Sequence, residues 1–178
     1  GYLYLSKPTD VLAWQGNLLI SNTAADSARV FTRSPGQLPR TTLLSFYKGS
    51  GGWPYFVMNA NTTTVSGLQS LIAGGNIGVI ESYEFNGAHG PALLIISNDL
   101  NYVYDGYIRN HSGGNASDSI AIIKQGTGTQ TFGNNLVTYT GLTWVAQGTM
   151  IFSNTTAFAG DITNDGRVVL APVTAGWT

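Results

Sequence analysis

The chain contains no cysteine, which excludes structural disulfides, thiolate zinc sites and cysteine nucleophiles together. Charge is scarce as well, because Asp, Glu, Lys and Arg make up only 10% of the 178 residues, whereas a soluble domain averages about 25%. The formal net charge is −1, so the sequence lacks the basic footprint of a nucleic-acid-binding protein. We therefore expect no nucleic-acid partner.

Long apolar runs are also missing. The longest uninterrupted ones lie near Ala92 to Ile96, well below the roughly 18 residues that a transmembrane helix requires, so we expect no membrane insertion. A chain of this length favours one domain over residues 1–178. In place of charge the sequence has 20 Thr, 14 Ser, 14 Asn and 23 Gly, and it begins at Gly1 without an initiator Met. This pattern favours a processed protein that is extracellular or lies on a cell or virion surface.

Short runs of β-branched, aromatic and aliphatic residues recur along the whole chain, with Gly, Asn, Asp or Pro between them. Such spacing is typical of an all-β protein, and it predicts an antiparallel β-sandwich of jelly-roll or Ig-like type. Only Ser66 to Ala73 has helical spacing, with Gly74 and Gly75 as its stop, so at most one short helix is expected.

Three dipeptides have the chemistry of tight hairpin turns, in which both residues accept a positive φ. They are Asn86-Gly87, Asp105-Gly106 and Asp165-Gly166, and each is predicted to join two antiparallel strands. The runs Ala92–Ile96 and Ile120–Ile123 do not alternate between apolar and polar residues, so we expect both strands to be buried on both faces.

Catalytic residues are not evident in the sequence. The imidazoles are His89 and His111, neither in a nucleophile motif, and both are interpreted as exposed loop residues. Glu81 and Glu84 lie three apart on a predicted strand, hence on opposite faces, and cannot flank one glycosidic bond. No pattern selects a partner among the remaining carboxylates considered, Asp10, Asp26, Asp99 and Asp118. We expect a protein that is not an enzyme.

The segment Asp161 to Gly166 imitates the start of a calcium-binding loop, with oxygen-bearing side chains at positions one, three and five and glycine at position six. Pro172 stands where the bidentate carboxylate should be. A tight turn is therefore the favoured interpretation, and we expect neither a metal nor a cofactor.

Four N-x-S/T sequons stand in loop-like stretches and are candidate glycosylation sites in a host that glycosylates. Composition alone predicts about three such motifs by chance. The four asparagines are Asn61, Asn110, Asn115 and Asn154.

Carbohydrate binding needs exposed aromatic rings beside polar groups. Trp53 is the best candidate because it lies with Tyr55 in a loop rich in Gly and Pro, where burial is least assured. Trp144 lies within a predicted strand and is expected in the core. Trp177 is the second-last residue and contributes only if the tail docks.

The first eight residues predict an extended terminal strand that is apolar on both faces, because Pro8 prevents a helix from running through it. Its residues are Tyr2, Leu3, Tyr4 and Leu5. The strand pairs within its own sheet or is donated to the open sheet edge of a second copy. We therefore expect a non-enzymatic subunit of a surface filament or fibre, with copies of itself as partners. The alternatives are a virus capsid or spike domain and a carbohydrate-binding module.

Overall fold

The computed structural model describes residues 1–23, 25–72, 78–83, 87–113, 115–133, 136–153 and 158–171. Within these ranges the chain forms seventeen strands and no helix. A helix long and apolar enough to cross a membrane is accordingly not found in them. Every strand pairing among them is parallel.

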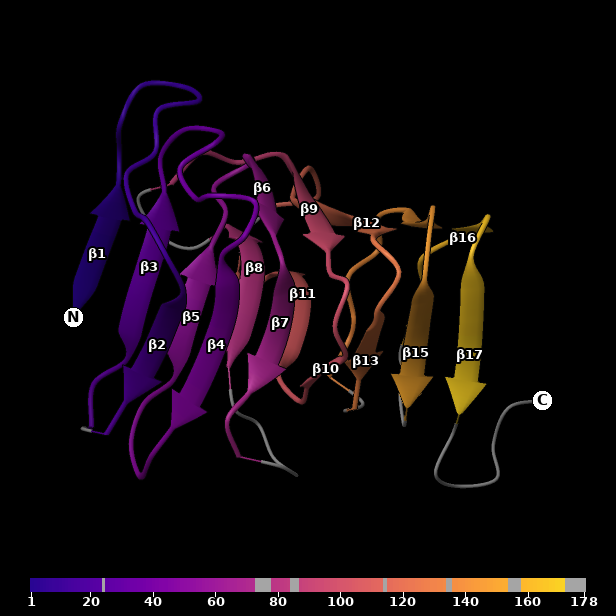
Figure 1. Cartoon of the computed structure of the whole chain (residues 1–178). Coiled ribbons are helices and arrows are strands. Elements are labelled where there is room, and N and C mark those ends of the chain that lie inside the picture. Colours follow the sequence, from indigo (N-terminus) through magenta and orange to yellow (C-terminus); the bar gives the residue numbers. More distant parts are fainter. Residues whose placement is uncertain are drawn as a thin grey trace.

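The strands form four sheets, named here A to D (Figure 1). Sheet A has the order β1 (Tyr2–Leu5), β3 (Ala28–Thr32), β5 (Pro54–Val57), β8 (Val79–Tyr83) and β11 (Tyr107–His111). Sheet B has the order β2 (Leu18–Asn22), β4 (Leu43–Lys48) and β7 (Gly67–Ser70). Sheet C has the order β6 (Thr62–Val65), β9 (Pro91–Ser97), β12 (Ser119–Gln125), β14 (Thr143–Val145) and β16 (Ile162–Asn164). Sheet D has the order β10 (Tyr102–Tyr104), β13 (Thr129–Phe132), β15 (Thr149–Ser153) and β17 (Arg167–Ala171).

The chain winds as a coil. It passes through β5, β6 and β7 on three sides, returns to sheet A in β8, and repeats the circuit through β9 and β10 and then through β11, β12 and β13. Sheets B and D continue one another, because β7 contacts β10. The architecture is a parallel β-helix, and Figure 1 shows its axis running from the N-terminal to the C-terminal side of the picture.

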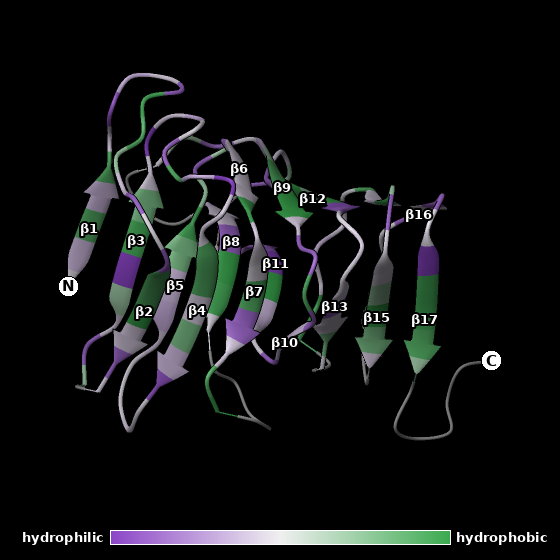
Figure 2. Cartoon of the chain, in the orientation of Figure 1, coloured by the Kyte–Doolittle hydropathy of each residue, from purple (hydrophilic) through white to green (hydrophobic). Residues whose placement is uncertain are grey.

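The core lies inside the coil, where side chains alternate between inside and outside along each strand. The strands accordingly mix hydrophobic and hydrophilic positions (Figure 2). Equivalent inward positions stack from rung to rung, as Val30, Phe56, Ile80 and Ile108 do in sheet A, and all four are buried. Burial of each such side chain contributes about 1.5 to 3 kcal/mol.

One buried side chain joins sheets B and D. The Gln130 amide in β13 accepts a hydrogen bond from Leu68 N at 3.0 Å and donates from Nε2 to Leu68 O, also at 3.0 Å. Among the described residues, no backbone hydrogen-bond ladder joins β7 to β10. The Gln130 side chain instead satisfies the backbone N–H and C=O of Leu68, as a neighbouring strand would. The two faces become one continuous wall.

The predicted antiparallel sandwich is wrong, because all four sheets are parallel. Asp105-Gly106 joins β10 to β11, and Asp165-Gly166 joins β16 to β17, yet each pair is divided between two sheets. The flanks of Asn86-Gly87 are β8 and β9, which also lie in different sheets, and Asn86 itself is outside the described residues. A glycine turn suits a corner between two faces as well as a hairpin, which explains the error.

The predicted helix from Ser66 is also wrong, because Gly67–Ser70 is strand β7 and pairs with β4. Ala73, Gly74 and Gly75 lie outside the described residues. Pairing against a neighbouring rung outweighs the weak local preference for a helix.

Burial on both faces was likewise predicted wrongly for two strands. In β9, Leu94 and Ile96 are buried, but Leu93 and Ile95 are only half-buried on the outside. The alternation in β12 is the same. Apolar residues on the outer face of a coil hide this alternation in the sequence.

Candidate functional site

Sheet A carries two rows of large side chains on its outer face. Because parallel strands align in register, equivalent residues stack along the axis at the strand spacing of about 4.8 Å. The first row is Tyr2, Arg29, Tyr55, Val79 and Tyr107, and the second is Tyr4, Phe31, Val57, Glu81 and Arg109. We call these two rows, together with Arg33, Lys48 and Trp53, the aromatic face.

The rings of this face contact one another across rungs. Tyr4 stacks on Phe31 with centroids 5.1 Å apart. Trp53, which directly precedes β5, meets the Tyr107 ring edge-on at 5.3 Å, although β8 lies between β5 and β11. Val79 on that intervening strand is only 1% exposed. The rings therefore form two contacting groups, one around Tyr4 and one around Trp53, which together we call the platform. Phe31 in the first group is fully buried.

Cations lie over these rings. The Arg29 guanidinium is 5.7 Å from the Tyr2 centroid and 4.9 Å from the Tyr55 centroid. Lys48 Nζ lies 4.7 Å from the Trp53 ring, and Arg33 lies 4.7 Å from a tyrosine ring, that of Tyr4. Cation–π attraction holds each charge in a defined place on the platform.

Glu81 is fully buried on this face and receives a hydrogen bond from Arg109 Nε at 2.9 Å. The Arg109 guanidinium also lies 5.5 Å from the Tyr107 ring. A buried carboxylate needs such a charged partner. Glu81 therefore anchors Arg109, whereas Glu84 lies outside the described residues.

A histidine–aspartate pair lies at the edge of the aromatic face. His89 Nδ1 is 2.9 Å from Asp118 Oδ2, and the imidazole stacks on Tyr83 with centroids 3.7 Å apart. Asp118 also accepts hydrogen bonds from Gly90 N and Asn115 N. Burial acts to raise the pKa of the Asp118 carboxyl, but the hydrogen bonds from His89, Gly90 and Asn115 outweigh it and lower that pKa.

Sequence reasoning missed this pair. His89 is exposed, as predicted, with 39% of its side chain accessible, but Asp118 fixes its orientation. The two residues are 29 positions apart, and only the coil brings them together. His111 was predicted as an exposed loop residue, but it is the last residue of β11 and half-buried. Its Nδ1 accepts a hydrogen bond from Gly113 N, and it aligns with Tyr83 in the register of β11 and β8. Both imidazoles of the chain therefore lie at one edge of sheet A.

Trp144 was predicted in the core but is 38% exposed. It is the middle residue of the three-residue strand β14, so it faces outward between two inward neighbours. Its Nε1 donates to Asp165 Oδ2 at 2.7 Å. Asp165 follows β16, so the segment that imitated a calcium loop is strand and turn. In the described ranges no group of three His, Cys, Asp or Glu is arranged to hold a metal ion.

The asparagine side chains of the four sequons differ in their hydrogen bonds. Asn61 Nδ2 donates to Thr32 O and Asn59 O, and Asn110 Nδ2 donates to the Thr140 hydroxyl. Asn115 is exposed, and its Oδ1 accepts a hydrogen bond from a backbone N–H. Asn154 lies outside the described residues.

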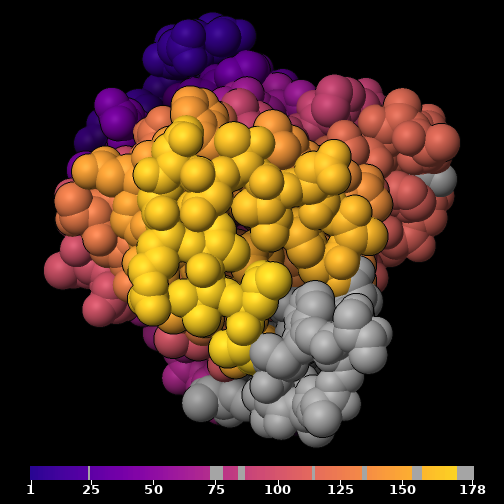
Figure 3. Space-filling model, turned by 90° about the vertical axis from the view of Figure 1, so that its right-hand side faces the viewer, coloured from indigo at the N-terminus to yellow at the C-terminus, as the bar shows by residue number. Residues whose placement is uncertain are grey.

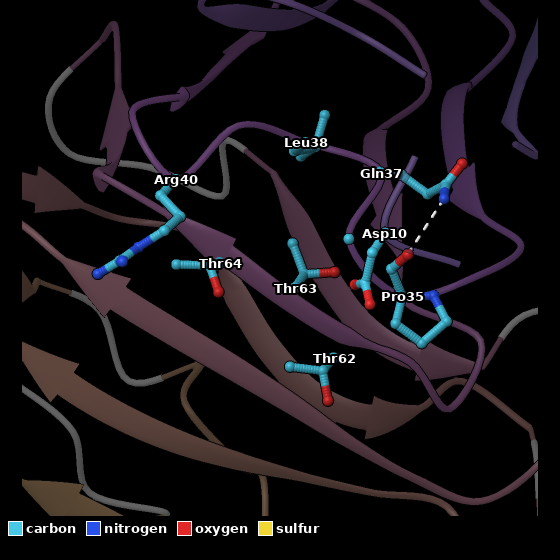
Figure 4. Close-up of a pocket in the computed structure, with 9 residues that line it drawn as sticks. Asp10, Pro35, Gln37, Leu38, Arg40, Thr62, Thr63 and Thr64 are labelled. Atoms are coloured by element: carbon cyan, nitrogen blue, oxygen red, sulfur yellow. Dashed lines mark hydrogen bonds between the residues drawn. The ribbon is translucent and has the colours of Figure 1, made fainter. Parts of the chain in front are cut away.

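A pocket of about 270 Å³ lies between strand β6 and the loop after β3 (Figure 4). Figure 4 shows Arg40 pointing away from Asp10, so the two charges do not converge on one ligand position. Gln37 donates to Pro35 O and accepts from Lys7 N, which orders the loops around the pocket. The pocket is thus explained by loop packing.

The predicted assembly strand is β1, and it pairs with β3 of its own chain in parallel register. Its other edge meets no strand in the part of the chain that the structure describes. Tyr2, Leu3 and Tyr4 are 55%, 41% and 44% exposed, and Leu5 is buried.

Comparisons with protein families, with curated proteins and with solved structures returned no match. Function is therefore inferred from the chemistry of these residues.

Proposed function

We propose that this chain is a non-enzymatic, extracellular carbohydrate-binding protein that holds a glycan along the aromatic face. The observation that carries this proposal is the platform of rings on the outer face of sheet A. Trp53 and Tyr55 belong to this face and are partly exposed. The π face of an aromatic ring packs against the C–H groups of a sugar, while neighbouring N–H and O–H groups bind its hydroxyls.

The shape of the face suits a linear polymer. Rings or cations recur at the rung spacing in the first row, from Tyr2 through Arg29 to Tyr55. A chain of sugars that lies along the axis would meet one such group at most rungs. A face on a rigid sheet also needs little ordering before it binds, which favours affinity.

Substitution of Trp53 by alanine tests the proposal. Affinity for a glycan found on an array should fall about tenfold or more, since the ring supplies on the order of 1.4 kcal/mol or more of contact. Trp144→Ala is the matched control, because Trp144 is also partly exposed but lies on sheet C. Circular dichroism confirms that both variants fold. Equal losses in both variants, or no glycan binding by the full chain, would contradict the proposal.

Self-association into a filament is a second candidate, favoured by the apolar first rung. Leu3 is 41% exposed, although Val30 and Phe56, which follow it in the register of sheet A, are buried. The edge of β1 that meets no strand among the described residues offers backbone groups for β-augmentation by a second copy. A head-to-tail contact of this kind extends into a fibre when its rotation does not close.

Sedimentation over a range of concentrations tests self-association. If the first rung is the contact, Leu3→Asp should reduce the sedimentation coefficient to that of a monomer, whereas Leu142→Asp, at an exposed leucine between β13 and β14, should not. A full-length chain that is monomeric at high concentration would exclude this candidate and leave glycan binding unaffected.

A further inference from the structure

We infer that the glycan bound by the aromatic face is acidic, a polysaccharide that carries carboxylate or sulfate groups. This inference rests on the proposed function and specifies its ligand. It follows from where the few charges of the chain lie, from how they are held, and from their spacing relative to the rings.

Cations are concentrated on this face. Of the eight Lys and Arg residues in the chain, four belong to it, and both histidines lie at its edge. The four are Arg29, Arg33, Lys48 and Arg109. A net charge of −1 would not predict this concentration. An excess of one charge on one face attracts a ligand of the opposite sign.

The carboxylates near the face are withdrawn from its surface. Glu81 and Asp118 each have 0% of the side chain exposed. Glu81 accepts from Arg109, and Asp118 accepts from His89. Asp26 is exposed in the turn before β3 and is the described carboxylate that stays at the border. Because Glu81 balances the charge of Arg109, the surplus positive charge of the face comes from Arg29, Arg33 and Lys48, against the exposed Asp26.

The spacing of rings and cations along the first row would let one ligand make both stacking and ionic contacts. Arg29 lies between Tyr2 and Tyr55 in the register of three successive strands. A sugar ring that packs beside Tyr55, one face of which the guanidinium already covers, would bring an acidic substituent within reach of Arg29. A guanidinium has a planar set of donors that matches the oxygens of a carboxylate or sulfate. Neutral sugars would use the rings alone.

Binding of the full-length chain to a fixed set of polymers tests the inference. The probes are alginate for carboxylates, dextran sulfate for sulfates, neutral dextran and cellohexaose as uncharged glycans, and polyglutamate and double-stranded DNA as polyanions without an acidic sugar chain to stack. We expect alginate or dextran sulfate to bind more tightly than every other probe. Raising the salt from about 0.05 to 0.5 M should weaken that binding, since screening reaches exposed charges.

Variants identify the cations responsible. Arg29→Gln and Arg33→Gln should each reduce affinity for the acidic glycan about tenfold, as expected for loss of a charge-assisted hydrogen bond. Arg29→Lys should restore part of the affinity. Arg167→Gln is the matched control, because Arg167 is exposed in sheet D, and it should change affinity less than about twofold. Thermal unfolding checks that each variant remains folded.

The outcomes separate this inference from the proposed function. Preference for alginate alone or for dextran sulfate alone supports the inference and identifies the acidic group. Tighter binding of a neutral glycan overturns the inference and leaves the proposed function standing. Equal binding of polyglutamate or DNA overturns the inference in favour of a general polyanion site, and failure to bind any glycan overturns both.

Discussion

The early and late rungs of this β-helix are built differently. In sheet C, Thr62 aligns with Leu93, which is 31 residues further along the chain. In sheet D, Met150 aligns with Val168, only 18 residues further. The early rungs include long loops and carry the aromatic face. The late rungs close with short turns, and their strands extend to the C-terminal end of the coil, which faces the viewer in Figure 3.

Glycine makes the short rungs possible. Gly126 and Gly148 have φ angles of 75° and 72°, which L side chains rarely adopt. A Cβ on Gly148 would meet Gly126 O at 2.3 Å, so the two corners pack directly on each other. A side chain at either glycine would therefore clash with the backbone of the neighbouring corner. Regular stacking thus provides the scaffold, and the aromatic face that we propose to bind a glycan lies where the rungs are long.

The largest expected effect on the free energy of unfolding comes from breaking the link between sheet B of the early rungs and sheet D of the late rungs. Gln130→Leu should lower the free energy of unfolding by about 2 to 5 kcal/mol, because it leaves both Leu68 N and Leu68 O buried without a partner. Urea unfolding measures this. Gln147→Leu, at an exposed side chain of the late rungs, should change the same quantity by less than about 0.5 kcal/mol. Similar values for the two variants would show that the hydrogen bonds of Gln130 do not stabilise the contact between sheets B and D.

The next largest effect on stability is expected at the histidine–aspartate pair at the edge of the aromatic face. Asp118→Asn should lower the free energy of unfolding by about 1 to 3 kcal/mol at pH 7. The reason is that the new NH₂ group must face a donor, either Gly90 N or Asn115 N. The lowered pKa of Asp118 means that its contribution is present above about pH 4 and is lost as pH falls through the folded-state value. The difference in the free energy of unfolding between wild type and variant should therefore shrink as the pH falls from 7 to 3. Asp161→Asn, at an exposed carboxylate, serves as the control.

The all-β character and most strand positions could be predicted from sequence, because β-branched runs and glycine turns are local signals. For example, the run Thr42–Tyr47 corresponds to β4, Leu43–Lys48. Strand direction could not be predicted, because Asp105-Gly106 suits a corner and a hairpin equally well. Rungs whose register spacing varies from 31 to 18 residues also leave no fixed repeat to detect.

The candidate site could be predicted only in part. Trp53 and Tyr55 were identified as a pair in a predicted loop, but Tyr55 lies in strand β5, and only Trp53 precedes the strand. Both belong to the aromatic face, and their contact with a sugar stays a prediction. Arg29 could not be linked to Tyr55, nor His89 to Asp118, because those neighbours belong to different rungs. Parallel register creates these contacts, and it has no counterpart in local sequence.

A smaller effect tests the buried lysine of the late rungs. Lys124 Nζ donates to Gln125 O at 2.7 Å and to Gly126 O at 2.9 Å, and burial lowers its pKa to about 8. The unfolded chain then binds the proton more tightly than the folded chain between about pH 8 and 10.5, so the free energy of unfolding should rise with pH. We expect a rise on the order of 1 kcal/mol from pH 8 to 9.5.

The Lys124→Met variant is the control for that rise, and its free energy of unfolding should not increase over the same pH range. The range stops at pH 9.5 because burial raises the pKa values of Tyr104 and Tyr139. Ionisation of these phenols favours the unfolded chain above pH 10. An equal rise in the variant would show that Lys124 is not the group that titrates.

The smallest effect compares the two partly exposed tryptophans. Trp144→Phe removes only the hydrogen bond from Nε1 to Asp165 Oδ2, and it keeps an aromatic ring on β14. Because this bond is exposed to solvent, its loss should lower the free energy of unfolding by about 0.5 kcal/mol and leave glycan affinity unchanged. Trp53→Phe should behave in the opposite way: the smaller ring contacts Tyr107 less and should weaken glycan binding, with little change in stability. Urea unfolding and glycan titration of both variants check this. If Trp144→Phe weakens glycan binding as much as Trp53→Phe, the late rungs also bind the ligand, and the division between scaffold and binding face is wrong.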